Sequence, residues 1–316
     1  MIARRLTNSS NSPLRYPGGK GKITRFIGDV MAKNGIDGTY IEPFAGGAGI
    51  AVNLLLSNRV DKILINDLDE GVYNFWKDVT ENPEWLMRMI KHVPFDYNDK
   101  PGTFSGVEYI RYWNSVKTRY IQNNYRDMRL KGFDFFMLNR MNVSGILKGG
   151  PIGGKQQDGT YNISSRFNKK TLLERIANLA NQSSRIIVTS LEGSYLCERL
   201  SQDNFLTGPM TNAFVFVDPP YYVQGKNLYN SYAPARIHKL VADRLMREHP
   251  WQWVLTYDTA AEINKLYSDD RTKKFKYQIT YSANKRGKFD EYMFASPELK
   301  ISSSENVHLE SISTPE

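Results

Sequence analysis

The chain has 316 residues, enough for one large core or for a core with a smaller second domain. Its formal net charge of +9 and its pI near 9.3 favour a polyanionic partner, because every lysine or arginine that neutralises a phosphate releases a condensed counterion. A single cysteine, Cys197, excludes an internal disulfide, and four scattered histidines offer no metal-ligand spacing, so we expect no metal. The sequence contains neither a long apolar run nor the apolar core of a signal peptide, which predicts a soluble, cytoplasmic protein.

The first patterned segments are an amino-terminal motif and a glycine-rich turn. Residues 13–20 read Pro-Leu-Arg-Tyr-Pro-Gly-Gly-Lys and precede a helical pattern that runs through Val30. A strand predicted at 39–44 then leads into Ala-Gly-Gly-Ala-Gly and an apolar helix over 50–56. Glycines at such a turn let a ligand approach the backbone, and the start of the helix presents free N–H groups. The turn therefore predicts a nucleoside-cofactor site.

The second strand, predicted at 62–66, is followed by Asp67. An acidic group at this tip can hold the hydroxyls of a ribose. The glycine turn and Asp67 would also suit a nicotinamide dinucleotide, but the fit to that fingerprint is poor. Read from Gly47, the G-x-G-x-x-G pattern requires glycine or alanine where Val52 stands.

Residues 80–170 interrupt the alternation of strands and helices and are rich in aromatic, basic and amide side chains. An insertion of this size predicts a separate, small, mainly helical domain. In its helix-like segment, packing on the protein is at least as well supported as ligand contact for Tyr109 and Trp113. Gly149–Lys155 has the spacing of a P-loop, but no buried strand precedes it and Gln156 replaces the magnesium-binding hydroxyl. We therefore predict a flexible hairpin there that faces the polyanionic partner.

Three further strands are predicted at 185–190, 213–217 and 252–257, with helical stretches between most of them. This alternation is typical of a doubly wound, mostly parallel α/β sheet. The segments 274–282 and 290–295 predict a terminal antiparallel hairpin around a basic tip at 284–288. From Ser296 the composition loses its periodicity, so we expect a frayed tail.

Asp218-Pro219-Pro220-Tyr221 follows the fourth strand. A carboxylate and a carbonyl that precedes proline can accept both hydrogens of an exocyclic amine, and a tyrosine ring can stack on the base. This arrangement suggests methyl transfer onto the amine of an extruded nucleobase. Methylation at cytosine carbon five would need a thiolate, whereas Cys197 lies in a helix-like context and is expected to be a buried packing residue.

Three segments, at 13–20, 40–49 and 218–221, resemble in this order the cofactor, glycine-rich and catalytic motifs of the Dam-type, alpha-group adenine-specific DNA N6-methyltransferases. Leu138-Asn139-Arg140 and Arg166-Phe167-Asn168 also look like parts of that family, so the resemblance covers most of 13–295. It implies an S-adenosylmethionine-dependent methyltransferase domain, an inserted target-recognition domain and a flexible tail. Their expected bounds are 1–79 with 171–296, 80–170, and 297–316.

The resemblance implies methyl transfer from S-adenosylmethionine to the amine of an adenine flipped out of double-stranded DNA. The implied catalytic residues are Asp218, Pro219, Pro220 and Tyr221, with Tyr222 as a second candidate for stacking. The implied cofactor contacts are Tyr16 near the methionine portion, Lys20 near its carboxylate, Gly19, Glu42, Phe44 and Gly46 around the pocket, Asp67 at the ribose, and Asp218. Which of the glycines at 46, 47 and 49 contacts the cofactor stays open. Expected DNA contacts are Arg140, Lys148, Lys155 and Arg166.

Three other readings stay open at this point. Methylation of the cytosine N4 amine would use the same constellation, although Asp rather than Ser before Pro-Pro-Tyr favours adenine. A DNA-binding protein without catalysis could keep the fold, but the presence of Asp218 and Lys20 argues against it. A nicotinamide-dependent oxidoreductase is favoured only by the glycine turn and Asp67. For partners we expect DNA, a monomeric enzyme, no membrane, and as an open option a cognate restriction endonuclease.

Overall fold

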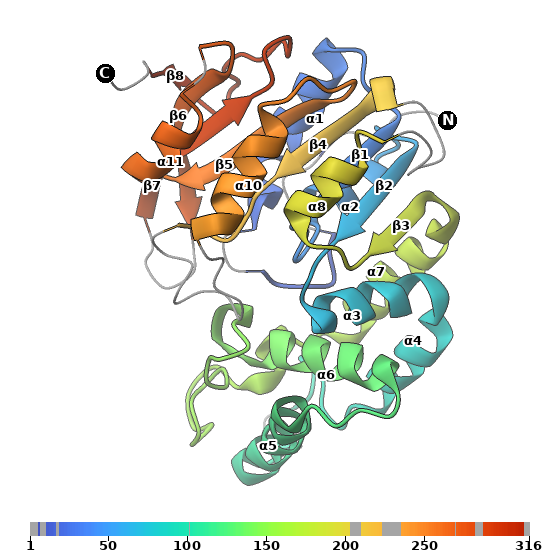
Figure 1. Cartoon of the computed structure of the whole chain (residues 1–316). Coiled ribbons are helices and arrows are strands. Elements are labelled where there is room, and N and C mark those ends of the chain that lie inside the picture. The colour runs from blue at the N-terminus through green and yellow to red at the C-terminus, as the bar shows by residue number, and fades with distance from the viewer. Residues whose placement is uncertain are drawn as a thin grey trace. The chain divides into compact units, whose positions relative to one another are not determined.

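The structure is a computed structural model and describes residues 6, 11–16, 19–100, 102–202, 210–222, 235–268, 270–281 and 287–312. Pro17 and Gly18 of the amino-terminal motif, residues 284–286 of the basic tip and residues 313–316 of the tail lie outside the described residues. The chain divides into two compact units (Figure 1). The first comprises 1–10, 20–68 and 185–316, and the second comprises 11–19 and 69–184.

The first unit is built on an eight-stranded sheet with the order β3-β2-β1-β4-β5-β7-β6-β8. Strands β1 to β5 run parallel, whereas β7 is antiparallel to both β5 and β6. The predicted mostly parallel α/β sheet with a carboxyl-terminal antiparallel hairpin is therefore confirmed. The strands are β1 (Thr39–Glu42), β2 (Lys62–Asn66), β3 (Ile186–Thr189), β4 (Ala213–Val217), β5 (Gln252–Asp258), β6 (Lys273–Tyr281), β7 (Gly287–Ala295) and β8 (Glu310–Ser311).

Helices cover both faces of this sheet, as Figure 1 shows for α8 and α10 on one side and α1 and α2 on the other. The central strand β4 is buried along its whole length, which explains why it reads as a continuous apolar run rather than an alternating one. The helical elements described in this unit are η1 (Lys20–Ile23), α1 (Thr24–Lys33), α2 (Gly49–Leu56), α8 (Gly193–Arg199), η5 (Met210–Asn212), α10 (Ala235–Leu245) and α11 (Ala261–Leu266).

Asn66, at the end of β2, fixes the neighbouring turns. Its amide nitrogen donates to the carbonyl oxygens of Pro43 at 2.8 Å and Leu191 at 2.9 Å. Its amide oxygen accepts from the backbone N–H of Leu191 and the hydroxyl of Thr189, both at 2.8 Å. The buried side chain thus satisfies its own polar atoms and ties the ends of β1 and β3 to β2.

The expectation of a frayed tail is wrong for residues 297–312. Leu299 and Val307 are buried, and β8 pairs antiparallel with β6 through Phe275 and Lys276. Two isolated apolar side chains anchor this segment, and its serine- and glutamate-rich composition conceals them in the sequence.

The second unit is helical apart from an isolated bridge between Asn142 and Pro151, as far as its described residues show. It extends beyond the expected 80–170, because α3 packs closely on α6. A Cβ atom at Gly132 would lie 2.6 Å from the backbone nitrogen of Phe75, so glycine is required for this approach. The elements are α3 (Glu70–Glu81), α4 (Pro83–His92), α5 (Gly106–Gln122), α6 (Met128–Met141), η2 (Val143–Gly145), η3 (Ile163–Arg166), α7 (Lys169–Ala180) and η4 (Ser183–Arg185), the last of which ends where the chain enters the first unit.

Aromatic side chains form the core of the second unit. The ring of Phe95 packs edge-on against Tyr109, Tyr112 and Phe167, with ring centroids 5.3 to 5.5 Å apart. Trp113 is buried and donates its indole N–H to the Asn142 side chain at 2.7 Å. Tyr109 and Trp113 are therefore packing residues. Across the described residues, no helix combines the length and apolar character that a membrane span requires.

Candidate active site

The predicted site residues of the first unit gather beyond the carboxyl ends of three adjacent parallel strands. Glu42 ends β1, Asp67 follows β2, and Asp218 follows β4. Open α/β sheets bind ligands at this edge, where the strand order reverses. In this sheet the reversal lies between β1 and β4, so the topology brings together residues that lie far apart in the sequence.

The turn after β1 shows which glycine has a special role. Gly46 adopts φ +46° and donates its N–H to Oδ2 of Asp67 at 2.8 Å. Neither Gly47 nor Gly49 has a positive φ, and Gly49 simply begins α2. The left-handed conformation favours glycine at 46, and its contact places the Asp67 carboxylate against the turn.

Glu42 is a buried carboxyl at the same edge. Its Oε1 accepts from the backbone N–H of Ala51 at 3.1 Å. Burial raises the pKa of Glu42 to about 8; the bond from Ala51 opposes this shift, and the charge of Asp218 adds to it. Burial thus favours the neutral form of this carboxyl.

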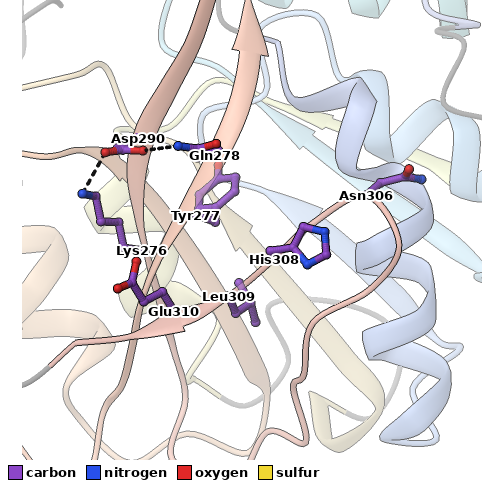
Figure 2. Close-up of a pocket in the computed structure, with 8 residues that line it drawn as sticks. All are labelled: Lys276, Tyr277, Gln278, Asp290, Asn306, His308, Leu309 and Glu310. Carbon is purple, nitrogen blue, oxygen red and sulfur yellow. Dashed lines mark hydrogen bonds and ion pairs between the residues drawn. The ribbon is translucent and has the colours of Figure 1, made fainter.

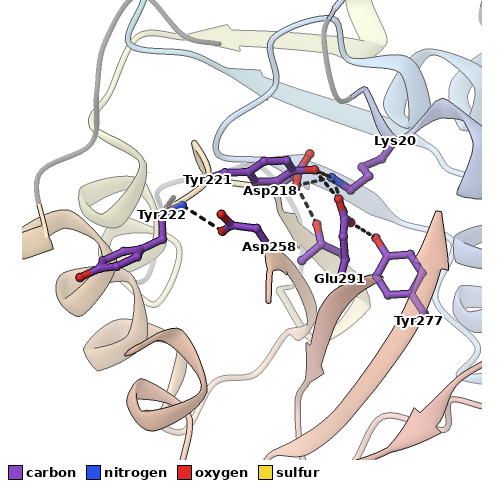
Figure 3. Close-up of polar contacts among 8 residues, drawn as sticks. Lys20, Asp218, Tyr221, Tyr222, Asp258, Tyr277 and Glu291 are labelled. Carbon is purple, nitrogen blue, oxygen red and sulfur yellow. Dashed lines mark hydrogen bonds and ion pairs between the residues drawn. The ribbon is translucent and has the colours of Figure 1, made fainter. Parts of the chain in front are cut away.

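Asp218 lies in a network of polar contacts that includes residues of η1, β5, β6 and β7 (Figure 3). Its Oδ1 accepts from Nζ of Lys20 at 2.8 Å and from Oγ1 of Thr256 on β5 at 2.7 Å. Burial raises the pKa of Asp218; Lys20 opposes this rise and the charge of Glu291 adds to it. No described residue donates to Oδ2, and the side chain is 18% exposed. The carboxylate thus keeps one oxygen for an incoming donor.

Lys20 and Tyr221 are bound to each other within this network. Nζ of Lys20 lies 2.7 Å from the Tyr221 hydroxyl and 4.9 Å from the centroid of its ring. Lys20 also lies 3.5 Å from Oε2 of Glu291, which accepts from the hydroxyl of Tyr277. The Lys20 ammonium is therefore held by acceptors of the protein beside the Asp-Pro-Pro-Tyr segment.

The two tyrosines that end this segment differ in their surroundings. Tyr221 is only 4% exposed, so its ring is almost fully covered in this structure. Tyr222 points away from Lys20 in Figure 3 and packs edge-on against His238 of α10, with ring centroids 5.3 Å apart. Its N–H donates to Asp258 at 3.0 Å. Of the two prolines that link Asp218 to Tyr221, Pro219 is buried and Pro220 is half-buried.

Sequence reasoning missed Thr256, Tyr277 and Glu291. Glu291 left a signal, since residues two apart on a strand share a face and its neighbours at 289 and 293 are Phe and Met. A carboxylate on an apolar strand face indicates either a buried ion pair or a site. Thr256 and Tyr277 left no such signal, because only the sheet order brings their strands to the site.

Of the expected DNA contacts in the second unit, Lys148, Lys155 and Arg166 are exposed. Arg140 is not: it is 8% exposed, and its guanidinium donates to the carbonyl oxygens of Pro13 and Arg166. Burial lowers its pKa to about 9. A guanidinium that serves internal carbonyls cannot reach a phosphate, so the expectation for Arg140 is wrong and its role is structural.

Tyr16 and Gly19 also belong to the second unit. Tyr16 is half-buried, Gly19 is exposed, and the N–H of Gly19 donates to the carbonyl of Tyr16 at 3.1 Å. Gly19 directly precedes Lys20 of the network around Asp218. Their implied contact with the cofactor stays a prediction.

The side chain of Gln157 makes hydrogen bonds across the glycine-rich loop. The Gln157 side chain donates to the carbonyl oxygen of Ile152 at 2.7 Å and accepts from the N–H of Ile163 at 2.9 Å. Gly153 and Gly154 take the left-handed conformation that these close turns require. Helix α6 and η2 precede the loop, not a strand, which removes the P-loop interpretation.

Cys197 is fully buried in α8, and burial raises the pKa of its thiol to about 12. The expected packing role is confirmed, and thiolate chemistry is disfavoured. Among the residues that the structure describes, no group of histidine, cysteine, aspartate or glutamate side chains is arranged to hold a metal ion.

Known proteins are similar to this chain at the level of a family and of a solved structure. The family model for D12 class N6 adenine-specific DNA methyltransferases matches residues 16–281. No curated protein matches the sequence. Among solved structures, the chain is similar to protein LPL1258 from Legionella pneumophila str. Philadelphia 1, with 14% identity, 87% of this chain and 82% of that chain covered, and a TM-score of 0.31.

Proposed function

Because the chain belongs to the D12 class N6 adenine-specific DNA methyltransferase family, which methylates adenine in DNA, we propose that it does so with S-adenosylmethionine beyond the carboxyl ends of β1, β2 and β4. The observation that carries this proposal is the position of Asp218. Its carboxylate is fixed through one oxygen by Lys20 and Thr256, and the other oxygen is left for the amine of a base.

The residues beside Asp218 fit the chemistry of the cofactor. Asp67 supplies a carboxylate for the ribose hydroxyls, and the left-handed Gly46 allows a close approach to the backbone. The first turn of α2, which starts at Gly49, adds free N–H groups at the same edge. Phe44, half-buried after β1, offers an aromatic surface for the pocket. Bound S-adenosylmethionine supplies an activated methyl group on a sulfonium.

Catalysis rests on acceptors and positioning, not on a nucleophile. Asp218 Oδ2 and the carbonyl oxygen of Pro219 accept the two amine hydrogens, which shifts electron density onto the attacking nitrogen. Asp218 takes up the proton that the methylated amine loses. The raised pKa of Asp218 suits this step, because burial makes its carboxylate a better proton acceptor than an exposed one.

The flipped adenine is expected to stack on Tyr221 once its ring has been uncovered. Nζ of Lys20 lies 2.7 Å from the hydroxyl oxygen and 4.9 Å from the centroid of this ring, so a stacked base would lie close to the ammonium. Tyr222 packs on α10 and is the weaker candidate. The position of Lys20 favours a role in holding Asp218 over the implied contact with the cofactor carboxylate.

We assign target recognition to the second unit, with 69–184 in place of 80–170 as its main segment. Exposed Lys148, Lys155 and Arg166 provide the charge for phosphates and base edges, and exposed Tyr161 provides an aromatic surface. A monomeric enzyme, acting alone or beside a cognate restriction endonuclease, is the working proposal for its assembly.

The test is transfer of tritiated methyl from S-adenosylmethionine to unmethylated duplex DNA, followed by nucleoside digestion and chromatography. Label in N6-methyladenine supports the proposal, whereas label in N4-methylcytosine or no label overturns it. Asp218→Ala should abolish turnover and leave cofactor binding measurable. Asp61→Ala is the matched control, because Asp61 is an exposed aspartate of the same unit that lies outside the site.

A further inference from the structure

A buried carboxylate from the carboxyl-terminal hairpin stands within the candidate site. Glu291 lies on β7, belongs to no motif that the sequence analysis singled out, and is 2% exposed. Burying an ionised carboxylate costs several kcal/mol unless partners compensate it. Glu291 is therefore expected to have donors at both of its oxygens.

Three donors surround the two oxygens of Glu291 (Figure 3). Oε1 accepts from the hydroxyl of Tyr221 at 2.5 Å. Oε2 accepts from the hydroxyl of Tyr277 on β6 and lies 3.5 Å from Nζ of Lys20. Two hydroxyls and an ammonium compensate the buried charge, so Glu291 is a defined part of the network.

The direction of these hydrogen bonds is fixed by chemistry. An ammonium can only donate, so Lys20 donates to the oxygen of Tyr221, and the hydroxyl proton of Tyr221 must point to Glu291. Lys20 donates in the same way to Asp218. Glu291 thus ends a chain of contacts that sets the rotamers of Tyr221 and Lys20, and through Lys20 that of Asp218.

Charge gives Glu291 a second effect on Asp218. The cluster holds one ammonium and two carboxylates, so Lys20 divides its field between Asp218 and Glu291. If Glu291 were neutral, Lys20 would compensate Asp218 alone. A fully compensated Asp218 is a weaker acceptor for an amine proton, because an adjacent cation stabilises its charge.

We propose that Glu291 is a positioning residue for methyl transfer: without touching the substrate, it holds Tyr221 and Lys20 in place and keeps Asp218 an effective acceptor. This inference rests on the proposed function. Tyr277 supports it by satisfying Oε2 from the neighbouring strand.

The test variant is Glu291→Gln, which keeps the size and the accepting oxygen of the side chain and removes its charge. We expect kcat to fall by about tenfold or more, while the KM for DNA and the dissociation constant of S-adenosylmethionine change by less than about twofold. Tyr277→Phe should lower kcat in the same direction by a smaller factor. It decides the question if Glu291→Gln does not fold.

Asp290→Asn is the matched control, since Asp290 is the next residue on β7 and its side chain points to the opposite face. There it pairs with Lys276 at 2.7 Å and with Gln278 at 3.1 Å, beside a pocket lined by Lys276, Tyr277, Gln278, Asp290, Asn306, His308, Leu309 and Glu310 (Figure 2). The same change from carboxylate to amide should leave kcat at the wild-type value.

The outcomes separate the inference from the proposed function. If wild-type protein places no label in adenine, the proposed function fails before any variant is compared. If the wild type methylates adenine and Glu291→Gln does so at the same rate, the inference alone is overturned. It is also overturned if the variant loses cofactor affinity and melting temperature in proportion to its activity, because that pattern marks a purely structural role.

Discussion

Replacing Gly193 by alanine tests whether Phe44 shapes the cofactor pocket. Gly193 is the first residue of α8, and a Cβ atom there would lie 2.2 Å from Cζ of the Phe44 ring and 2.5 and 2.7 Å from its two Cε atoms. Carbon atoms pack at about 3.5 Å or more, so the ring would have to withdraw by roughly 1.3 Å. Overpacking of this kind typically costs about 1–3 kcal/mol.

We expect Gly193→Ala to lower the melting temperature by a few degrees and to weaken binding of S-adenosylmethionine by up to about tenfold, the factor that corresponds to about 1.4 kcal/mol. Calorimetric titration and thermal melting measure the two effects. Because Phe44→Leu removes the ring edge, the double variant should be more stable than the sum of the single effects predicts.

Gly150→Ala is the control for melting and cofactor binding, since a Cβ atom there would have no other atom within 4 Å and its φ is not positive. It should match the wild type in both measurements. Wild-type melting and cofactor affinity in Gly193→Ala, or strict additivity in the double variant, would refute the reasoning.

Four other substitutions test the structure. Burial raises the pKa of Asp78 to about 7. Its contribution to the free energy of unfolding is therefore fully present below pH 4 and is lost as the pH rises through 7. In thermal melts between pH 4 and 8, Asp78→Asn should flatten this pH dependence, which amounts to at most about 4 kcal/mol. Arg140→Met should lower the free energy of unfolding in urea melts by about 1–3 kcal/mol, because internal carbonyl oxygens lose their donor. Lys155→Ser should leave stability unchanged and reduce the salt dependence of DNA binding by about one phosphate contact. The reverse pattern would contradict both assignments. Leu299→Ala should cost about 2–5 kcal/mol of stability in the same melts, and an unchanged midpoint would show that the tail is not anchored.

The sequence predicted the parallel sheet because its inner strands are buried on both faces and read as continuous apolar runs, as Ala213–Val217 does. The carboxyl ends of such strands meet at one edge, so Glu42, Asp67 and Asp218 could be placed together from their positions alone. The predicted end of the first strand was wrong by two residues, because β1 ends at Glu42 and not at residue 44.

The remaining features depend on contacts that no local pattern records. Tyr277 and Glu291 reach the site through the order of β5, β7 and β6, which alternation along one strand cannot predict. Arginine is a residue type expected at a DNA contact, which is why the sequence suggested this role for Arg140. Only the packing of the second unit shows that its guanidinium points inward, to the carbonyl oxygens of Pro13 and Arg166. The tail illustrates the same limit, because Leu299 is buried by partners that lie far away in the sequence.

The turns at the proposed cofactor edge depend on one amide nitrogen, that of Asn66. Deamidation would convert its side chain to a carboxylate and set an anionic oxygen against the carbonyl oxygens of Pro43 and Leu191, where two N–H bonds of 2.8 and 2.9 Å now hold the turns together. The repulsion would push apart the ends of β1 and β3 that frame the glycine turn. We therefore expect the loss of this one nitrogen to act on the proposed cofactor pocket through the turns that frame it.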